Sequence, residues 1–344
     1  MRMNDLTKML GSTDERLFKL THDGFQTVVS ESGESITLSA GISEETESSI
    51  LAALANYPNV KNVYFVDVNI TGRVADALLK LPELTTLSLS SSFFGRGGNM
   101  SFESLSFLRD AMNLTSLYLY ATSPPIDISE LTQLKSITAD DNTLYDMNLL
   151  EPLHELEELS FLEYSNDAGY FPWTNPSNIK DVSPLKKLPK LRSLSLTIGS
   201  HDTDLSSFAD LKQIKRLTLC IDNDYDITPI GELTQLDELA ICTNNQKYGR
   251  VDDAVNGFNT LSTLTNLMSL TVPNFGIRCL EPVRNMTRLQ GLYCPGNHIR
   301  SLKPIEAHTE LRELDIEGNP IKDYAPIRRL PHYVPNWEPE RKIK

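Results

Sequence analysis

The feature that most constrains the fold of this chain is a pattern of regularly spaced apolar residues that recurs along most of its length. Its clearest copy, residues 311–321 (LRELDIEGNPI), has apolar residues at positions 1, 4, 6 and 11 and asparagine at position 9. Eleven copies, most of them 20 to 24 residues apart, open at Val60, Leu84, Leu114, Leu134, Leu156, Leu191, Ile214, Leu236, Leu267, Leu289 and Leu311. Recurrence at this period predicts a solenoid, in which each copy is one structural unit stacked on the next.

Each copy alternates apolar and polar residues, as a β-strand with one buried face requires. In the last copy, Leu314 and Ile316 are predicted to point to one face, whereas Glu313, Asp315 and Glu317 point to the other. Stacked copies should therefore form one parallel sheet over a shared core. The asparagine at position 9 is expected to satisfy backbone groups where the chain leaves the strand. It is present as Asn142, Asn244, Asn297 and Asn319.

The second half of several copies carries a proline directly before an apolar residue. These prolines are Pro184, Pro282, Pro304 and Pro326. Because proline cannot continue a helix for long, we expect short 3₁₀ turns rather than full α-helices on this side of the repeat.

Together these two halves form the signature of the leucine-rich repeat. The style of the second half resembles the 22-residue class seen in bacterial internalins and in the phosphatase-regulator type of repeat, over about three quarters of the chain. The resemblance implies an α/β solenoid: a leucine-rich-repeat horseshoe with a curved parallel β-sheet and a mostly 3₁₀ or irregular convex side. It does not imply a partner, because the same scaffold serves unrelated ones.

The repeat also divides the chain. Residues 60–329 hold about 11 leucine-rich repeats, and residues 1–59 form a small N-terminal region of short strands plus one helix. We interpret this region as a cap over the open end of the core, with a separate recognition module as the alternative. Residues 330–344 are predicted to close the other end as a C-terminal cap or tail.

Charge and hydropathy narrow the possible partners. The formal net charge of −14 disfavours nucleic acid and anionic membranes, both of which attract basic surfaces. The sequence has no apolar run of transmembrane length and no apolar segment typical of a signal peptide, so we expect a cytoplasmic protein. We also expect the protein to be monomeric when free. The spacing of the four cysteines fits neither zinc nor a disulfide framework, which favours free thiols.

A search for catalytic and metal-binding motifs is negative. The six histidines have no recurring spacing, and no nucleophile elbow, phosphate loop, dinucleotide fingerprint or zinc helix is present. Residues 222–226 begin like a calcium loop but lack the glycine and glutamate that such a loop needs later, which favours a simple acidic corner. We therefore expect a protein that is not an enzyme and has no cofactor or metal.

Most of the remaining residues that indicate a function lie on the predicted concave face. Positions 3, 5, 7 and 8 of the repeats hold nine acidic residues and a single basic one, Arg216. The acidic residues are Asp67, Asp140, Asp141, Glu158, Glu163, Glu238, Glu313, Asp315 and Glu317, and tyrosines of the same face are Tyr64, Tyr118, Tyr120 and Tyr293. Tyrosine beside carboxylates is typical of protein recognition, since tyrosine anchors a partner and charge steers it. The alternative is ordinary polar cover of an exposed sheet.

Three long copies add candidate binding loops. Their extra residues follow the strand in each case and should emerge on one edge of the solenoid. The middle loop carries Tyr170 and Trp173, which either contact a partner or fold back onto the repeats.

These features predict a protein–protein interaction module that binds a basic protein through its acidic, tyrosine-bearing concave face. The most concrete hypothesis is a bacterial immunity or antitoxin-like inhibitor of a small basic toxin. The alternative is a regulatory adaptor, or an exported bacterial effector that binds a host protein.

Overall fold

The computed structural model describes residues 26–39, 46–66, 68–90, 106–120, 127–139, 146–161, 179, 181–198, 203–221, 225–243 and 257–331. The chain divides into two compact units, which are described separately. The first unit comprises residues 1–172 and 187–191, and the second comprises residues 173–186 and 192–344.

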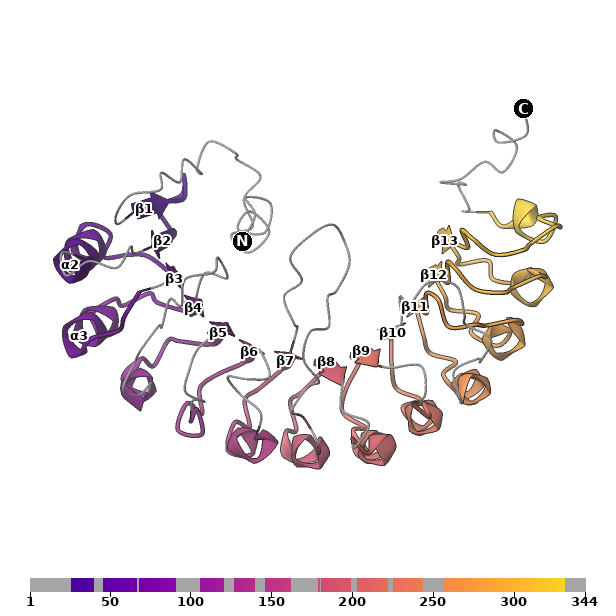
Figure 1. Cartoon of the computed structure of the whole chain (residues 1–344), viewed down its shortest axis with the longest axis horizontal. Coiled ribbons are helices and arrows are strands. Elements are labelled where there is room, and N and C mark those ends of the chain that lie inside the picture. The colour runs from indigo at the N-terminus through magenta and orange to yellow at the C-terminus, as the bar shows by residue number, and fades with distance from the viewer. Residues whose placement is uncertain are drawn as a thin grey trace. The chain divides into compact units, whose positions relative to one another are not determined.

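The first unit is built on strands that follow one another in chain order. They are β1 (Gln26–Val29), β2 (Ser35–Ser39), β3 (Asn62–Val66), β4 (Thr86–Ser90), β5 (Ser116–Tyr120), β6 (Ser136–Ala139) and β7 (Glu158–Phe161). The pair β1–β2 is an antiparallel hairpin, and every later pair is parallel. The return segments contain α2 (Thr46–Asn56), α3 (Gly72–Leu79), η2 (Ser106–Asp110) and η3 (Met147–Leu150). These helices lie on the outer side of the unit, with the strands on its inner side (Figure 1).

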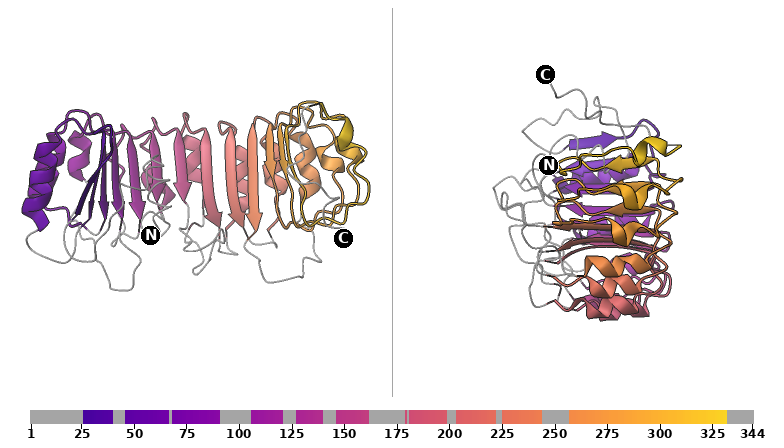
Figure 2. Two further views of the ribbon diagram at one scale, coloured as in Figure 1. Left: turned by 90° about the horizontal axis from the view of Figure 1, so that it is seen from above. Right: turned by 90° about the vertical axis from the view of Figure 1, so that its right-hand side faces the viewer.

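The second unit repeats this plan with parallel strands only. They are β8 (Ser193–Ile198), β9 (Arg216–Ile221), β10 (Glu238–Thr243), β11 (Ser269–Thr271), β12 (Gly291–Tyr293) and β13 (Glu313–Asp315). Its return segments hold η5 (Leu205–Asp210), η6 (Thr228–Glu232), η7 (Phe258–Thr263), η8 (Glu281–Val283), η9 (Lys303–Ile305) and η10 (Ile327–Arg329). The segment η4 (Ser183–Lys187) spans the division between the units. Apart from the antiparallel β1, the strands of each unit lie side by side with a common direction (Figure 2).

Repeat positions map directly onto burial. The leucines at positions 4 and 6 of β4 and β5, namely Leu87, Leu89, Leu117 and Leu119, are fully buried. The opening residue of each repeat is also buried, so positions 1, 4 and 6 form a continuous core in each unit. The leucine-rich-repeat solenoid predicted from the sequence is therefore confirmed as the fold class.

The outer side is mostly 3₁₀ helix, as the prolines predict. In the described part of the chain, nine 3₁₀ segments accompany only the two α-helices. Pro282 and Pro304 lie in the first turns of η8 and η9, where a backbone N–H would have no helical partner in any case. Both prolines are buried, so they also contribute to the core.

The N-terminal part joins the same ladder of strands. Strand β2 pairs with β3 in parallel from Ser35↔Asn62 to Ser39↔Val66. The parallel pairing therefore begins within residues 1–59, which the sequence reading assigned to the cap. The boundaries at residues 59 and 329 stay predictions, and most of the expected C-terminal tail lies outside the described residues. Within the described ranges, no helix is both long and apolar enough to cross a membrane.

Asn297 confirms the expected role of asparagine at position 9. Its side chain is buried, and its Oδ1 accepts hydrogen bonds from the N–H groups of Phe275 and Ile277 at 2.8 and 3.0 Å. Its Nδ2 donates to the carbonyls of Val272 and Cys294 at 2.9 and 3.0 Å. One amide thus satisfies four backbone groups from two neighbouring repeats. The asparagines at 142 and 244 lie outside the described residues.

His308 occupies a core position that neighbouring repeats fill with apolar residues. The equivalent residues are Met286 and Leu264, which have the same backbone hydrogen bonds. His308 is fully buried, and its Nε2 lies 3.1 Å from the carbonyl oxygen of Val283. Because that oxygen only accepts, Nε2 must carry the proton, and Nδ1 has no partner in the described part of the chain. Burial lowers the pKa of this imidazole.

Removal of the Asn297 amide should strongly destabilise the protein. The Asn297→Ala variant leaves buried N–H and C=O groups without partners, and we expect a loss of about 3 kcal/mol in the free energy of unfolding, measured by urea denaturation. The matched control is Asn319→Ala, since Asn319 makes similar bonds but is only half-buried. Equal effects of the two substitutions would contradict this account.

His308 should make the protein sensitive to acid. A histidine whose pKa is lower in the folded state binds protons more readily when unfolded, so stability is complete above the unfolded pKa of about 6.5 and falls as the pH drops below it. We expect His308→Met to remove part of the stability loss between pH 7.5 and 5.5 in thermal melts. At pH 7.5 the two proteins should differ by less than about 1 kcal/mol. An unchanged pH dependence would refute the assignment.

Candidate functional site

The polar face of the strands, here called the inner face, is formed by positions 3, 5 and 7 of the repeats. Because the parallel strands pair in register, equivalent positions lie side by side in rows across each unit. In the first unit, the row at position 5 contains Thr37, Tyr64, Ser88, Tyr118, Thr138 and Ser160. In the second unit, it contains Ser195, Thr218, Ala240, Thr271, Tyr293 and Asp315.

Two tyrosines dominate the inner face of the first unit. Tyr64 on β3 is buried and Tyr118 on β5 is half-buried, with Ser88 of β4 between them in the same row. The Ser88 hydroxyl is buried and has no hydrogen-bond partner among the described residues. Burial is the main cause that raises the pKa of both tyrosines, and the charge of Glu158 raises that of Tyr118 further. The phenols therefore stay neutral and can donate hydrogen bonds.

Not all predicted residues of this unit can be placed. Glu158 is exposed at the start of β7, and the backbone of Tyr120 ends β5. The remaining predicted residues, whose positions lie outside the described residues, are Asp67, Asp140, Asp141, Glu163, Tyr170 and Trp173. Their part in a binding site stays a prediction, as does that of the Tyr120 side chain.

The second unit brings a tyrosine and carboxylates together at its last strand. The Tyr293 hydroxyl on β12 donates a hydrogen bond to the Glu313 carboxylate on β13. Tyr293 is also the register partner of Asp315, and the Asp315 carboxylate accepts a hydrogen bond from the N–H of Glu317 at 3.1 Å. We call Tyr293, Glu313, Asp315 and Glu317 the acidic cluster. The Glu313 hydrogen bond, burial and the nearby negative charges together raise the pKa of Tyr293 to about 12.

A glycine makes room for this arrangement. Gly291 lies two residues before Tyr293 on the same face and is the register partner of Glu313. A Cβ atom at Gly291 would lie 2.8 Å from Cε2 of the Tyr293 ring and 3.1 Å from its hydroxyl. The ring therefore leans over the glycine, which places the hydroxyl beside Glu313.

Glu238 is separate from the acidic cluster. It is exposed at the start of β10, and its register partner on β9 is Arg216. Arg216, the one basic residue at the inner-face positions of the repeats, thus lies beside an acid. By contrast, Glu313 and Asp315 pair in register with Gly291 and Tyr293 on β12, and neither of these is basic.

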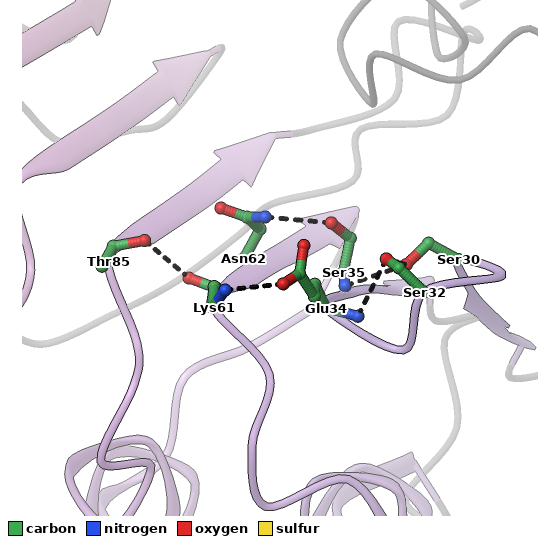
Figure 3. Close-up of polar contacts among 7 residues, drawn as sticks. All are labelled: Ser30, Ser32, Glu34, Ser35, Lys61, Asn62 and Thr85. Atoms are coloured by element: carbon green, nitrogen blue, oxygen red, sulfur yellow. Dashed lines mark hydrogen bonds and ion pairs between the residues drawn. The ribbon is translucent and has the colours of Figure 1, made fainter.

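Basic residues instead line the edge where the strands begin, at position 2, and several form ion pairs there. The Lys61 Nζ donates to the Glu34 carboxylate at 2.6 Å, which raises the pKa of Lys61 (Figure 3). Around this pair, Asn62 donates to the Ser35 hydroxyl at 3.0 Å, and the Thr85 hydroxyl donates to the Lys61 carbonyl at 3.2 Å.

The same pairing recurs further along this edge. Lys135 lies 3.6 Å from the Glu157 carboxylate, and Lys215 lies 3.8 Å from the Asp237 carboxylate. Each pair joins position 2 of one repeat to position 2 of the next. Lysines at the edge where the strands begin are therefore partly neutralised by acids of the neighbouring repeats.

The structure also brings together two of the four cysteines that the sequence predicts to be free thiols. Cys220 and Cys242 are register partners on β9 and β10. Both occupy position 7, 22 residues apart, so the repeat period itself contained the signal. Within the described residues, no group of three or more histidine, cysteine or acidic residues is arranged to hold a metal ion.

The bond between Tyr293 and Glu313 gives a direct test of this geometry. In Glu313→Gln, the loss of the negative acceptor should lower the pKa of Tyr293 from about 12 toward the ordinary value of about 10. Tyrosine-labelled NMR across an alkaline titration measures this pKa, and Tyr293→Phe assigns the signal. The control is Glu238→Gln, which lies two strands from Tyr293. An unaltered Tyr293 pKa in Glu313→Gln would contradict the contact.

Comparison with known proteins agrees with the fold. No family model matches the chain, and no curated protein matches it. Among solved structures, an internalin (inlF) from Listeria monocytogenes is similar, with a TM-score of 0.52 and 23% identity over 81% of this chain and 73% of that chain. An internalin C2 (inlC2) from the same organism gives a TM-score of 0.45 and 24% identity over 60% of this chain and 80% of that chain. The first likeness shows that the chain has a leucine-rich-repeat fold of the internalin type.

Proposed function

We propose that this chain is a non-enzymatic module that binds a basic protein through its inner face. The fold supports a binding role, because a leucine-rich-repeat solenoid presents a broad, preformed sheet surface. The proposal depends most on one observation: the carboxylates of the acidic cluster have no ion pair with any residue that the structure describes.

The distribution of ion pairs supports this view. Carboxylates at position 2, such as Glu157 and Asp237, are paired with lysines of the preceding repeat. Among the ion pairs between described residues, none involves Glu313, Asp315 or Glu317. In the described part of the chain, acids at the edge of the sheet are thus paired, whereas Glu313, Asp315 and Glu317 have no ion pair, which suits a partner that brings its own positive charge.

Tyrosines supply the second component of the proposed surface. Tyr293 is held by Glu313, while Tyr64 and Tyr118 are held by burial, so little side-chain freedom remains to be lost on binding. Rigid aromatic side chains next to charge are frequent anchors at protein interfaces. In the second unit the proposed site is the acidic cluster. In the first unit Tyr64, Tyr118 and Glu158 form a separate candidate surface, which is tested by itself.

The most specific form of this proposal is an immunity or antitoxin-like protein. An acidic, preformed surface would neutralise a small basic toxin, such as a nuclease, in the cell that produces both. The second candidate is an adaptor or exported effector that binds a host protein. Detection of the protein outside the cell that produces it would distinguish this candidate from the first.

Charge reversal on the inner face tests the proposal. The tagged full chain would capture its partner from native cells at low and moderate salt, in parallel with a Glu313→Lys/Glu317→Lys variant. The matched control is Glu306→Lys/Glu310→Lys, which has the same net charge but alters exposed acids on the opposite side of the repeat. We expect the inner-face variant to weaken binding of a basic protein by about tenfold or more, mainly through slower association.

The outcomes separate the alternatives. An equal loss in both variants would mean that net charge alone attracts the protein, and no loss in either would remove the acidic cluster from the site. A Tyr118→Ala variant tests the first unit in the same assay. The proposal would be overturned if binding were unaffected by salt, by either double variant and by Tyr118→Ala.

A further inference from the structure

Cys220 and Cys242 are register partners near the ends of the neighbouring strands β9 and β10 of the second unit. Parallel strands are about 4.8 Å apart, so in-register residues have Cα atoms at nearly that separation. Both side chains alternate with buried core residues, Leu219 on β9 and Ile241 on β10, and therefore both point to the inner face.

The two thiols differ in access. Cys220 is 3% exposed and is flanked in its row by Thr197 on β8, which is also buried. Cys242 is half-buried, because β10 pairs with β11 only as far as Ala240↔Thr271 and leaves the end of β10 unpaired on that side. A reagent can therefore approach Cys242, whereas Cys220 is accessible mainly to Cys242.

Each thiol also affects the ionisation of the other. The neighbouring Cys220 thiol lowers the pKa of Cys242, whereas Cys242 and burial raise the pKa of Cys220. The physical cause is that the neighbouring Cys220 S–H group stabilises the negative charge of a Cys242 thiolate. One proton then leaves the pair easily and the second does so with difficulty, as in other closely coupled thiol pairs.

We propose that Cys220 and Cys242 form a redox-active thiol pair, which a low-molecular-weight disulfide such as glutathione disulfide oxidises reversibly to an intrachain disulfide. The inference rests on the strand register and on the unequal access of the two thiols. It is independent of the proposed partner binding.

The reaction follows ordinary thiol–disulfide exchange. The Cys242 thiolate attacks one sulfur of glutathione disulfide, forms a mixed disulfide and releases one glutathione thiolate. Cys220 then loses its proton to that base or to water, attacks the Cys242 sulfur and displaces the second glutathione. Two protein thiols are oxidised to one disulfide, and the glutathione disulfide is reduced to two thiols.

Strand geometry favours a reversible product. A Cα separation near 4.8 Å lies inside the range of about 4.4–6.8 Å that disulfides require. The Cβ atoms of in-register parallel residues are also about 4.8 Å apart, and a disulfide needs about 3.5–4.5 Å. The strands must therefore approach slightly, and a mildly strained disulfide is easier to reduce than a relaxed one.

The other two cysteines serve as internal controls. Cys279 is exposed and Cys294 is fully buried. Burial raises the pKa of Cys294 to about 12, which keeps its thiol protonated and unreactive. Cys279 should carry bound glutathione after oxidation, because it has no neighbouring thiol to displace it.

The test exposes the folded full chain to glutathione redox buffers, blocks the remaining thiols under denaturing conditions and maps the cysteine peptides by mass spectrometry. We expect a cross-linked Cys220–Cys242 peptide pair, glutathione on Cys279 and a blocked free thiol on Cys294. Reduced glutathione should reverse the cross-link. Recovery of Cys220 and Cys242 as blocked free thiols, or stable glutathione on Cys242 of the unaltered chain, would overturn the proposal.

Two variants identify the roles of the thiols, with circular dichroism as the check on folding. Cys220→Ala should accumulate glutathione on Cys242, since no thiol remains to displace it, and alkylation of Cys242 should require a higher pH. Cys242→Ala should leave Cys220 unmodified. A trivalent arsenical such as phenylarsine oxide, which bridges two adjacent thiols, should bind the unaltered chain and lose its binding in either variant. Unchanged arsenical binding in both variants would also contradict the pair.

Discussion

In-register pairing of parallel strands is the constraint on which the rest of this structure depends. Each strand places its residues beside the same repeat positions of its neighbours, so a position that recurs in the sequence becomes a row in space. Rows 4 and 6 form the core, and rows 3, 5 and 7 form the inner face. A shift of one residue would exchange these rows, exposing leucines and burying carboxylates, and such a shift is therefore excluded.

The rows also decide which polar residues meet. At position 2, Lys61, Lys135 and Lys215 each pair with an acid of an adjacent repeat, and exposed pairs of this kind contribute little stability. Asn297 contributes far more, because its four partners are buried backbone groups that have no access to water. The structure is therefore stabilised chiefly by its apolar rows and by the asparagine corners, while the charged rows remain available for binding.

The sequence predicted the parts of the fold that depend on a single repeat. The buried positions, the corner asparagine and the 3₁₀ turns each follow from residues within one copy. Strand β2 was missed as a member of the ladder because Gly33 stands where other copies have their apolar opening residue, although Ile36 and Leu38 fill positions 4 and 6. The contact between Tyr293 and Glu313 depends on the missing side chain of Gly291, a relation between repeats that composition cannot reveal. The cysteine pair was overlooked because spacing along the chain was judged by local motifs and not by the repeat period.

The location of the acidic cluster also has a physical explanation. Glu313 and Asp315 alternate along β13, so these two residues are about 6–7 Å apart along the chain, and Glu317 lies in the turn that follows the strand. Across the sheet, the neighbours on β12 are Gly291 and Tyr293, which carry no charge at neutral pH. Strand β13 is the last in the order of the sheet, so no further strand of it adds charge on the other side. Repulsion among these acids is consequently weak and screened by salt, and a charged surface can persist there at little cost to folding.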